Sequence, residues 1–316
     1  MLAYSGLRSP TETLNLKRII LLLALAILPA RNVLATQPTP SPVKKACDAG
    51  IVLKLSADTT SQGSLLLAEI SGAKTTQEFA AEWDGRTIPL WRENPSSTTL
   101  HALLGVDLEK PPGRYDWKLS WSASDGKALV CSVPVTVRAG KFPTEHLKVD
   151  KQYVQPDPEQ QKRAEDDQKK MQAIYDTVTP EMLWKGKFRV PLKDVTTGGN
   201  FGRRRVLNGQ ARSPHAGVDF PAAAGTPVYA AQAGKIALAE NLYYSGNTVV
   251  IDHGFGIYTL YAHLSEINVH PGDSVELSTE IGKVGATGRV TGPHLHWGLT
   301  IDHARVNALQ IVQRQP

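Results

Sequence analysis

Short runs in which apolar and polar residues alternate recur along most of the chain, and turn residues separate them. Examples between residues 46 and 140 are "IVLKL", "SLLLAEI", "YDWKLSW" and "LVCSVPVTV". A period of two sends successive side chains to opposite faces of a strand, so these runs predict β-strands. The 26 glycines and 21 prolines supply the turns that many short strands require. The chain is therefore expected to be mainly β.

The 316 residues suffice for two domains, each with its own core. Strand and turn spacing predicts an immunoglobulin-like β-sandwich over residues 46–145. A second β-rich domain is expected over residues 186–316. Residues 146–185 are expected to be a linker with a helix in the stretch "DPEQQKRAEDDQKKMQAIY", which Asp157 can cap and Pro158 can begin.

The amino terminus has the organisation of a signal peptide over residues 1–35. Basic residues precede the apolar run of residues 19–28, and a small-residue cleavage pattern ends at Ala35. This run is shorter than the ~20 residues of a membrane-spanning helix, so no stable membrane insertion is expected. An uncleaved anchor is the alternative. Residues 36–45, "TQPTPSPVKK", are expected to be a linker, and the protein to be exported to the periplasm or cell envelope.

The formal net charge of +5 belongs largely to this leader. Residues 1–35 hold four basic residues and one acidic residue, a net charge of +3, so the remaining chain carries only +2. A charge this small does not indicate nucleic acid as a partner.

The chain has two cysteines, Cys47 and Cys131. Cys131 lies in an alternating run with Val133 and Val135, so its side chain should face a core. Cys47 shares the parity of Leu53 and is expected to face the same core. Export to an oxidising compartment favours a disulfide between them, and two buried free thiols are the alternative.

Seven of the nine histidines lie in residues 215–303, which places the expected chemistry in the second domain. In "SPHAGVDF", His215 and Asp219 are four residues apart on an extended segment, so they could share one ion only if the chain bends, and Gly217 allows a bend. A histidine and a carboxylate are normal zinc ligands. This spacing alone is weak, because such pairs are common.

Two further histidine motifs follow. In "GPHLHWGL", His294 and His296 share one face of a strand at a separation of ~7 Å, so both imidazoles can reach one small site. A surface pair without a role is the alternative. In "IYTLYAHLSEI", His263 ends a strand in which Thr259, Tyr261 and His263 are expected to share one side.

The order His-x-x-x-Asp, Tyr-Ala-His-Leu and Gly-Pro-His-x-His resembles that of the lysostaphin/LytM-type zinc metallopeptidases, which cut cell-wall peptides. The stretches "GTPVYAAQAGKI", "GNTVVIDHGFGIYTLYAHLS" and "VGATGRVTGPHLHWGL" are also similar to that family, and the resemblance covers residues 186–312. It implies one zinc ion per chain, held by His215, Asp219 and His296, with His263 and His294 acting beside the metal. Three protein ligands leave a fourth position for water.

The resemblance implies a zinc-dependent endopeptidase that cuts peptidoglycan stem peptides or cross-bridges. Zinc would activate a water, and a histidine would serve as general base. Which of His263 and His294 is the base stays open. Some relatives of this fold have lost their ligands and activate other wall hydrolases, so a non-enzymatic or autoinhibited activator is the alternative, with the sandwich or the connecting helix holding the site shut.

Further side chains are candidates for substrate binding. Arg203, Arg204 and Asn208 lie in the basic stretch "FGRRRVLNGQ" and could meet substrate carboxylates. Simple solvation is the alternative. His253 in "IDHGFG" could line the cleft or could instead shape a turn.

Overall fold

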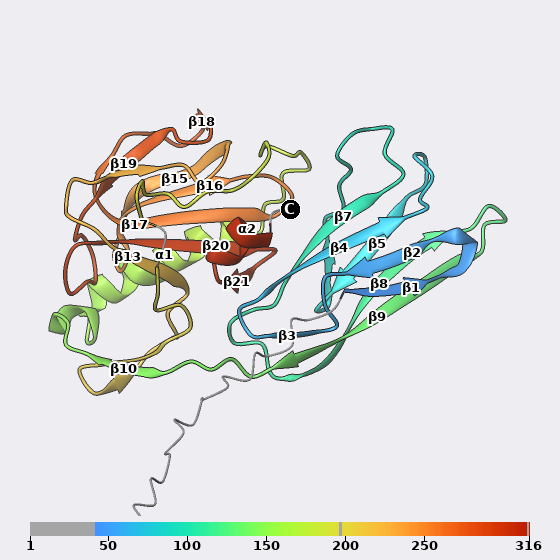
Figure 1. The fold of residues 1–316 in the computed structure, drawn as a ribbon. Helices are drawn as coiled ribbons and strands as arrows, with labels where there is room; N and C mark the ends of the chain where they lie inside the picture. The colour runs from blue at the N-terminus through green and yellow to red at the C-terminus, as the bar shows by residue number, and fades with distance from the viewer. Residues whose placement is uncertain (1–41, 196–197, 315) are drawn as a thin grey trace, which may run out of the picture. The chain divides into compact units, whose positions relative to one another are not determined.

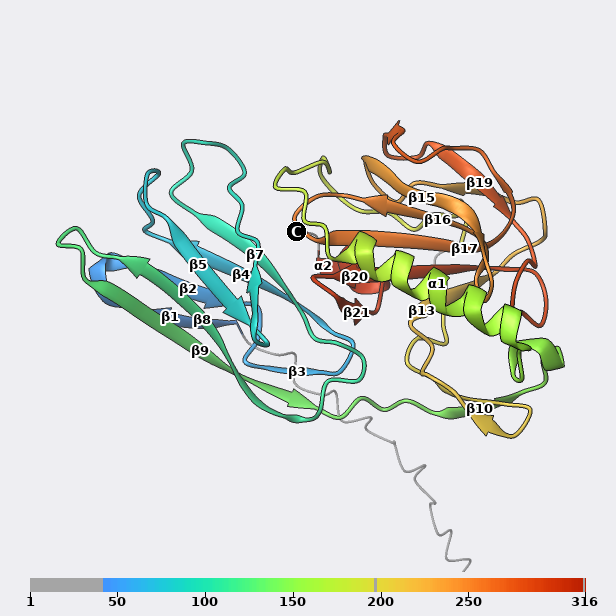
Figure 2. The same ribbon diagram turned by 180° about the vertical axis from the view of Figure 1, so that it is seen from behind.

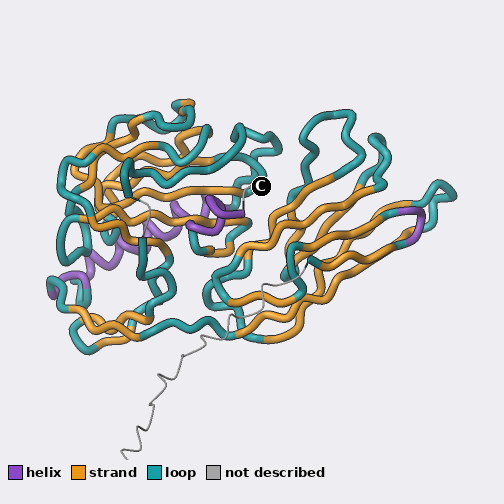
Figure 3. Tube along the Cα trace, viewed as in Figure 1, coloured by secondary structure: helices purple, strands orange, loops and turns teal. Residues whose placement is uncertain are grey.

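The computed structural model describes residues 42–195, 198–314 and 316. The expected signal peptide, residues 1–35, lies outside the described residues. Strands dominate the described chain, so the prediction of a mainly β protein is confirmed (Figures 1 and 3). Among the helices described, none combines the length and the apolar character that crossing a membrane demands.

Two sheets are built from residues 43–138 (Figure 1). In sheet order, the first contains β1 (Val43–Ala46), β2 (Val52–Leu55), β4 (Leu65–Ser71) and β7 (Leu100–Gly105), and the second contains β3 (Thr59–Ser61), β9 (Ala128–Arg138), β8 (Gly113–Ser122), β5 (Phe79–Trp83) and β6 (Arg86–Ile88). A 3-10 turn, η1 (Asp48–Gly50), joins β1 to β2. One hydrophobic core takes side chains from both sheets, including Leu53 from β2 and Trp117 and Leu119 from β8.

The expected linker over residues 36–45 ends earlier than the sequence indicates. β1 begins at Val43 and pairs antiparallel with β2, with Val43 opposite Leu55. Lys44 and Lys45 are exposed on this edge strand. Because these residues are polar, the composition of the segment does not indicate a strand. The backbone pairing, which composition does not report, is what orders these residues.

A disulfide joins Cys47, next to β1, to Cys131 in β9, with their Cα atoms 6.0 Å apart. The bond therefore links the two sheets. Cys131 is buried and Cys47 is partly buried against the same core. Cross-linking residues 84 positions apart restricts the unfolded chain more than a short loop would.

A larger sheet occupies the carboxyl-terminal part of the chain (Figure 1). Its main path contains β13 (Gly217–Pro221), β20 (His294–Ile301), β17 (Ile257–Ile267), β16 (Gly246–Asp252), β15 (Gly234–Leu242) and β18 (Ser274–Val275), while β14 (Pro227–Tyr229), β19 (Glu280–Val284) and β21 (Ala304–Val306) pair alongside it. The short helix α2 (Leu309–Arg314) follows β21.

The register of the central strands sorts their side chains onto two faces. Trp297 in β20 lies opposite Tyr261 in β17 and Val218 in β13, and all three are fully buried in one core. The preceding residue of β20, His296, lies opposite Asp219, so these two side chains occupy the other face. The alternation of "GPHLHWGL" thus places apolar residues in the core and histidines outside it.

Helix α1 (Pro158–Tyr175) covers part of this second face (Figure 2). The predicted start is confirmed: Asp157 is the N-cap, Pro158 opens the helix, and Gln160 completes a capping box with Asp157. Met171 and Tyr175 pack against a cluster that includes Val250. A narrow apolar stripe therefore holds the helix against the sheet, although most of the helix residues are charged or polar.

A separate small sheet contains β10 (Thr144–Leu147), β11 (Arg204–Leu207) and β12 (Gln210–Ala211). β10 runs parallel to β11, with Glu145 opposite Arg205. The sequence divides the sandwich from the linker at residue 145, which cuts through β10. After β10 the chain passes through the 3-10 turn η2 (Lys151–Tyr153) into α1.

Candidate metal centre

Three potential ligand atoms converge at one end of the large sheet. Nε2 of His215 lies 3.0 Å from Oδ1 of Asp219 and 2.8 Å from Nδ1 of His296, and the last two atoms are 3.0 Å apart. The three side chains are buried or nearly so. Two imidazole nitrogens and a carboxylate oxygen with one shared focus are the donor set of a zinc site.

A backbone carbonyl orients the first of these rings. Nδ1 of His215 lies 2.9 Å from the carbonyl oxygen of Asn200. A carbonyl only accepts hydrogen bonds, so Nδ1 carries the proton and Nε2 presents its lone pair to Asp219 and His296. This arrangement prepares His215 to bind a cation through Nε2.

Gly217 serves the site by lacking a side chain. A Cβ at this position would lie 2.5 Å from Nε2 of His296, far inside van der Waals contact. The sequence predicts a bend at Gly217, but this residue begins the regular strand β13. The His296 ring occupies the space that any larger residue would fill, so Gly217 allows this ring to lie close to β13.

Electrostatics keep the donor set in the protonation state that a cation needs. Burial by itself raises the pKa of Asp219, but hydrogen bonds and charge from His215 and His296 outweigh it and hold that pKa far below the usual range. Burial lowers the pKa of His296 to about 4. At neutral pH the site therefore presents an ionised carboxylate and a neutral imidazole.

A β-bulge carries His263 to the same place. Val249 pairs with Tyr261 and Asn247 pairs with Leu264, so one residue of β16 between these pairs faces two residues of β17, Ala262 and His263. His263 lies in this extra length with a φ of 64°, a left-handed conformation that is uncommon for histidine. Such backbone conformations concentrate at functional sites.

The bulge makes one expectation from the sequence wrong. Alternation predicts that Thr259, Tyr261 and His263 share one side, but the Tyr261 hydroxyl bonds the backbone of Ala231 in the core. The His263 ring instead lies 4.9 Å from the ring of His294, centroid to centroid. An extra residue in a strand moves every following side chain to the opposite face.

His294 completes the group from β20. Its Nε2 lies 3.7 Å from Oδ1 of Asp219, farther than the nitrogens of His215 and His296. Its Nδ1 lies 2.8 Å from the carbonyl oxygen of Gly292, so Nε2 is the atom free to act. The structure thus separates His294 from the three converging donors by geometry.

A cavity of about 100 Å³ opens in front of these residues. His263, His294 and Asp219 line it, together with Leu147 at the end of β10 and Val149 just after that strand. Within the described ranges, no residue of the two sheets over residues 43–138 and none of α1 lines this cavity. Of the described chain up to the end of α1, residues 145–149 line this cavity, and the two sheets and α1 do not cover it.

The candidate substrate-binding residues of the basic stretch lie near this cavity rather than in it. Arg203 forms an ion pair with Glu145 at 3.2 Å, and Arg204 is exposed. The amide of Asn208 bonds the backbone of Val149 and so shapes the turn after β11. Among the described residues that line the metal-site cavity, none of the three appears.

The prediction that His253 could line the cleft is wrong. His253 has no exposed surface and lies in the core beside Phe188. Its Nδ1 bonds the carbonyl of Ala233 at 2.7 Å, and its Nε2 bonds the hydroxyl of Thr259 at 2.7 Å. Burial lowers its pKa to about 4, so it is a neutral structural residue. Its polarity suggested a site, but both nitrogens are satisfied internally.

The sequence reasoning missed Arg205 and Asn200. A guanidinium nitrogen of Arg205 lies 3.5 Å from Oδ2 of Asp219, and the amide nitrogen of Asn200 lies 3.4 Å from the same oxygen. In a strand over "RRRVL", alternation would place the side chains of Arg204 and Arg205 on opposite faces, and this is the signal that could have identified Arg205. The sequence holds no comparable signal for Asn200, which acts mainly through its backbone.

Comparison with known proteins locates a family domain in this region. Residues 213–308 match Peptidase family M23. The peptidoglycan DD-endopeptidase ShyA of Vibrio cholerae serotype O1 is 46% identical over 112 residues, which are 35% of this chain and 26% of ShyA. The DD-carboxypeptidase/endopeptidase Mpg of Neisseria meningitidis serogroup B is 38% identical over 133 residues, which are 42% of this chain and 31% of Mpg.

A solved structure extends the likeness. The crystal structure of a Pseudomonas aeruginosa protein assigned to peptidase M23 aligns with 80% of this chain and 94% of its own, at a TM-score of 0.56 and 27% identity. The shared fold thus reaches well beyond residues 213–308. By contrast, the chain spans only about a quarter to a third of the curated relatives ShyA and Mpg.

Proposed function

We propose, from the match of residues 213–308 to Peptidase family M23, that the chain is a zinc-dependent endopeptidase of peptidoglycan. The observation that carries the proposal is the convergence of His215, Asp219 and His296, at 2.8–3.0 Å from one another, beside two further oriented histidines. All five side chains lie within the family domain.

The donor set fits one zinc ion per chain. His215, Asp219 and His296 would hold it, and the cavity would leave a position open for water or substrate. When bound, zinc lowers the pKa of a water towards about 7 and polarises a peptide carbonyl. The fit rests on the chemistry and orientation of the three donors.

His263 and His294 would serve as the general acid–base catalyst and as the group that stabilises the oxyanion during hydrolysis. Each has its Nδ1 bonded to a backbone carbonyl, which leaves Nε2 to accept a proton from the attacking water or to donate one to the leaving amine. The other ring, once its Nε2 has also taken up a proton, would donate a hydrogen bond to the oxyanion of the tetrahedral intermediate. Their ring centroids lie 4.9 Å apart, so both reach one scissile bond.

For the bond cut, we propose the cross-link between D-alanine and a diamino acid. ShyA and Mpg carry DD-endopeptidase activity in their names, which supports this choice. For the location, we propose that residues 1–35 direct export and that the protein acts in the periplasm or cell envelope. The disulfide between Cys47 and Cys131 supports an oxidising compartment.

The proposal can be tested by digesting purified, cross-linked peptidoglycan with the protein and measuring product masses. The digestion would be repeated with a zinc chelator and with His296→Ala. His270→Ala is a matched control, because that imidazole is exposed and its ion-pair partner is Asp273, away from the metal site. We expect the wild type and the control to release monomers from cross-linked dimers, and the other two samples to release none.

The zinc content of each sample distinguishes the alternatives. Intact cross-links in a wild-type protein that holds one zinc ion per chain would contradict the proposed enzyme and favour a non-enzymatic or autoinhibited activator. Cleavage that persists in His296→Ala would contradict the assignment of the ligands.

A further inference from the structure

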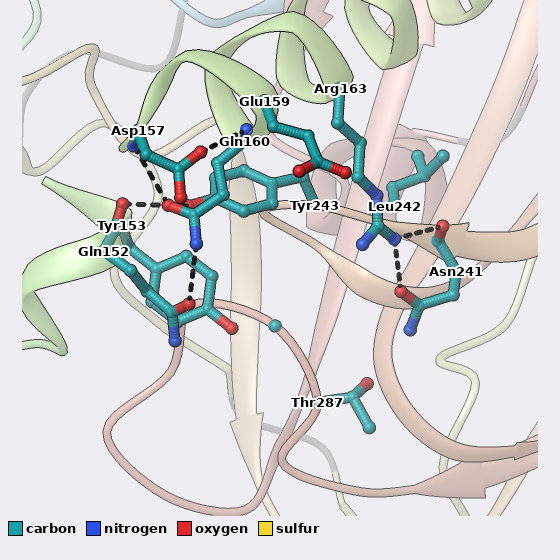
Figure 4. Close-up of a pocket in the computed structure, with 11 residues that line it drawn as sticks. Gln152, Tyr153, Asp157, Glu159, Gln160, Arg163, Asn241, Leu242, Tyr243 and Thr287 are labelled. Atoms are coloured by element: carbon teal, nitrogen blue, oxygen red, sulfur yellow. Dashed lines mark hydrogen bonds between the residues drawn. The ribbon is translucent and has the colours of Figure 1, made fainter. Parts of the chain in front are cut away.

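A second and larger cavity of about 600 Å³ lies between α1, η2 and the sheet (Figure 4). Gln160 extends from α1 towards Gln152, and Arg163 extends from the same helix to Asn241. Thr287 lies across the cavity from the helix (Figure 4). The cavity is open to solvent and its wall mixes polar and aromatic side chains.

The same two chain segments line this cavity and the metal-site cavity. Residues 287–288 line the larger cavity and residues 289–291 line the smaller one. On the opposite wall, residues 145–149 line the smaller cavity, and residues 152–163 contribute the wall of the larger one. Neighbouring stretches of the same two segments thus line the two cavities, and we refer to the two cavities together as the groove.

A row of ring contacts connects the two ends of the groove. Arg289, which lines the metal-site cavity, lies over the ring of Tyr244 at 4.5 Å. The Tyr244 ring contacts Tyr243 at a centroid distance of 4.8 Å, and Tyr243 contacts Tyr153 at 5.4 Å. Tyr243 and Tyr153 line the larger cavity, so a chain of packed side chains links the walls of the two cavities.

Thr287 couples the groove to the catalytic group. The carbonyl oxygen of Thr287 accepts the hydrogen bond from Nδ1 of His263, and Thr287 also lines the larger cavity. A ligand seated in that cavity therefore lies against the loop that orients His263.

The wall has the chemistry of a site for a neutral, many-hydroxyl ligand. Gln152, Gln160 and Asn241 carry amides whose oxygens already accept hydrogen bonds within the protein, while their NH₂ groups keep further hydrogens that a ligand oxygen can accept. Three charged side chains, Asp157, Glu159 and Arg163, also line the cavity. Their formal charges, two negative and one positive, nearly cancel, so the wall does not favour a strongly charged ligand.

We propose that this cavity binds the N-acetylated glycan strand that carries the peptide substrate. The acetamido and hydroxyl groups of an amino sugar match the amides, and its C–H faces match the tyrosine rings. A volume of about 600 Å³ accommodates a disaccharide. The identity of the ligand as peptidoglycan glycan rests on the proposed function, and the site would place the strand beside the bond to be cut.

The test is direct binding of an N-acetylglucosamine tetramer and of peptide-free glycan strands to the full chain, by titration calorimetry. Tyr153→Ala and Arg163→Ala are measured separately, with Lys162→Ala as the matched control, because Lys162 is exposed on α1 and faces Asp166. We expect each of the first two variants to raise the dissociation constant at least tenfold and the control to leave it unchanged. Thermal unfolding identifies any variant that fails to fold. If one of the two variants does not fold, the dissociation constant of the other variant tests the proposal.

Two results would overturn the glycan site: no binding of either glycan by the wild type at millimolar concentration, or equal binding by the wild type and both variants. The His296→Ala protein should bind glycan like the wild type, because the cavity contains no zinc ligand. If glycan binds but cross-links stay intact, the proposed peptidase fails and the glycan site stands. If cross-links are cut and glycan does not bind, only the glycan site fails.

Discussion

Nδ1 of His263 lies 2.9 Å from the carbonyl oxygen of Thr287, and this contact determines which nitrogen of the ring can act. The carbonyl holds the proton on Nδ1, so Nε2 is available to the site. Gly292 orients His294 in the same way. Two histidines from different strands therefore present the same atom, each fixed by a backbone group that mutation of a side chain does not remove.

We expect His263→Ala and His294→Ala each to lower kcat on cross-linked peptides by about 10²–10⁴-fold, the usual contribution of a general acid or base. Burial, with the charges of His296 and His294, lowers the pKa of His263 to about 3, so this imidazole is neutral at pH 7 and can accept a proton. Zinc content should stay at one ion per chain, measured by atomic absorption. Loss of zinc in either variant would mean that the histidine is a ligand.

We expect Arg205→Ala to weaken zinc binding by about tenfold, since groups that hold a metal ligand in place typically contribute 10–100-fold. Arg205 lies 3.5 Å from Asp219, whereas the neighbouring Arg204 is exposed and makes no such contact. Competition with a fluorescent chelator measures the affinity, and Arg204→Ala is the control. Equal affinities for both variants would show that Arg205 does not support Asp219.

We expect Asp302→Asn to raise the melting temperature at pH 7 by about 1.5–2 °C, the shift that ~1 kcal/mol causes at an unfolding entropy of ~2.1 cal/mol/K per residue. Burial raises the pKa of Asp302, against the opposing charges of Arg86 and His303, and no described residue hydrogen-bonds its Oδ2. Asparagine tolerates the left-handed backbone at this position, where φ is 46°.

The pH dependence checks the cause of this stabilisation. A carboxyl whose pKa is raised by folding destabilises the protein while it is ionised, and this penalty disappears as the pH falls below the unfolded value of 3.8. The difference between Asp302→Asn and the wild type should therefore shrink on acidification. A difference that is constant from pH 7 to pH 3 would contradict an electrostatic origin. The exposed Asp125, treated in the same way, should show no gain.

Local pattern in the sequence was sufficient for several features. The alternation in "GPHLHWGL" separates His296 from the buried Trp297, as the sheet register shows. Asp157 and Pro158 mark the start of α1. These features depend on neighbours in the chain, because a strand or a cap is defined by residues within a few positions of one another.

Other features needed the folded chain. His263 reaches the site through a bulge that alternation cannot reveal, and His253 is satisfied in the core by groups that only folding brings near. Arg205 is distinguished from Arg204 by its distance to Asp219. The groove arises where residues 152–163 meet residues 287–288.

By itself, therefore, the sequence determined which histidines and which aspartate are candidates for the site, because residue type and short spacing are local properties. Only the tertiary structure decided which nitrogen each histidine offers, which polar side chains are buried away from the site, and which cavities lie beside it. Those properties depend on contacts between segments that lie far apart in the chain, and on small register shifts that redirect side chains without changing the residues in the pattern.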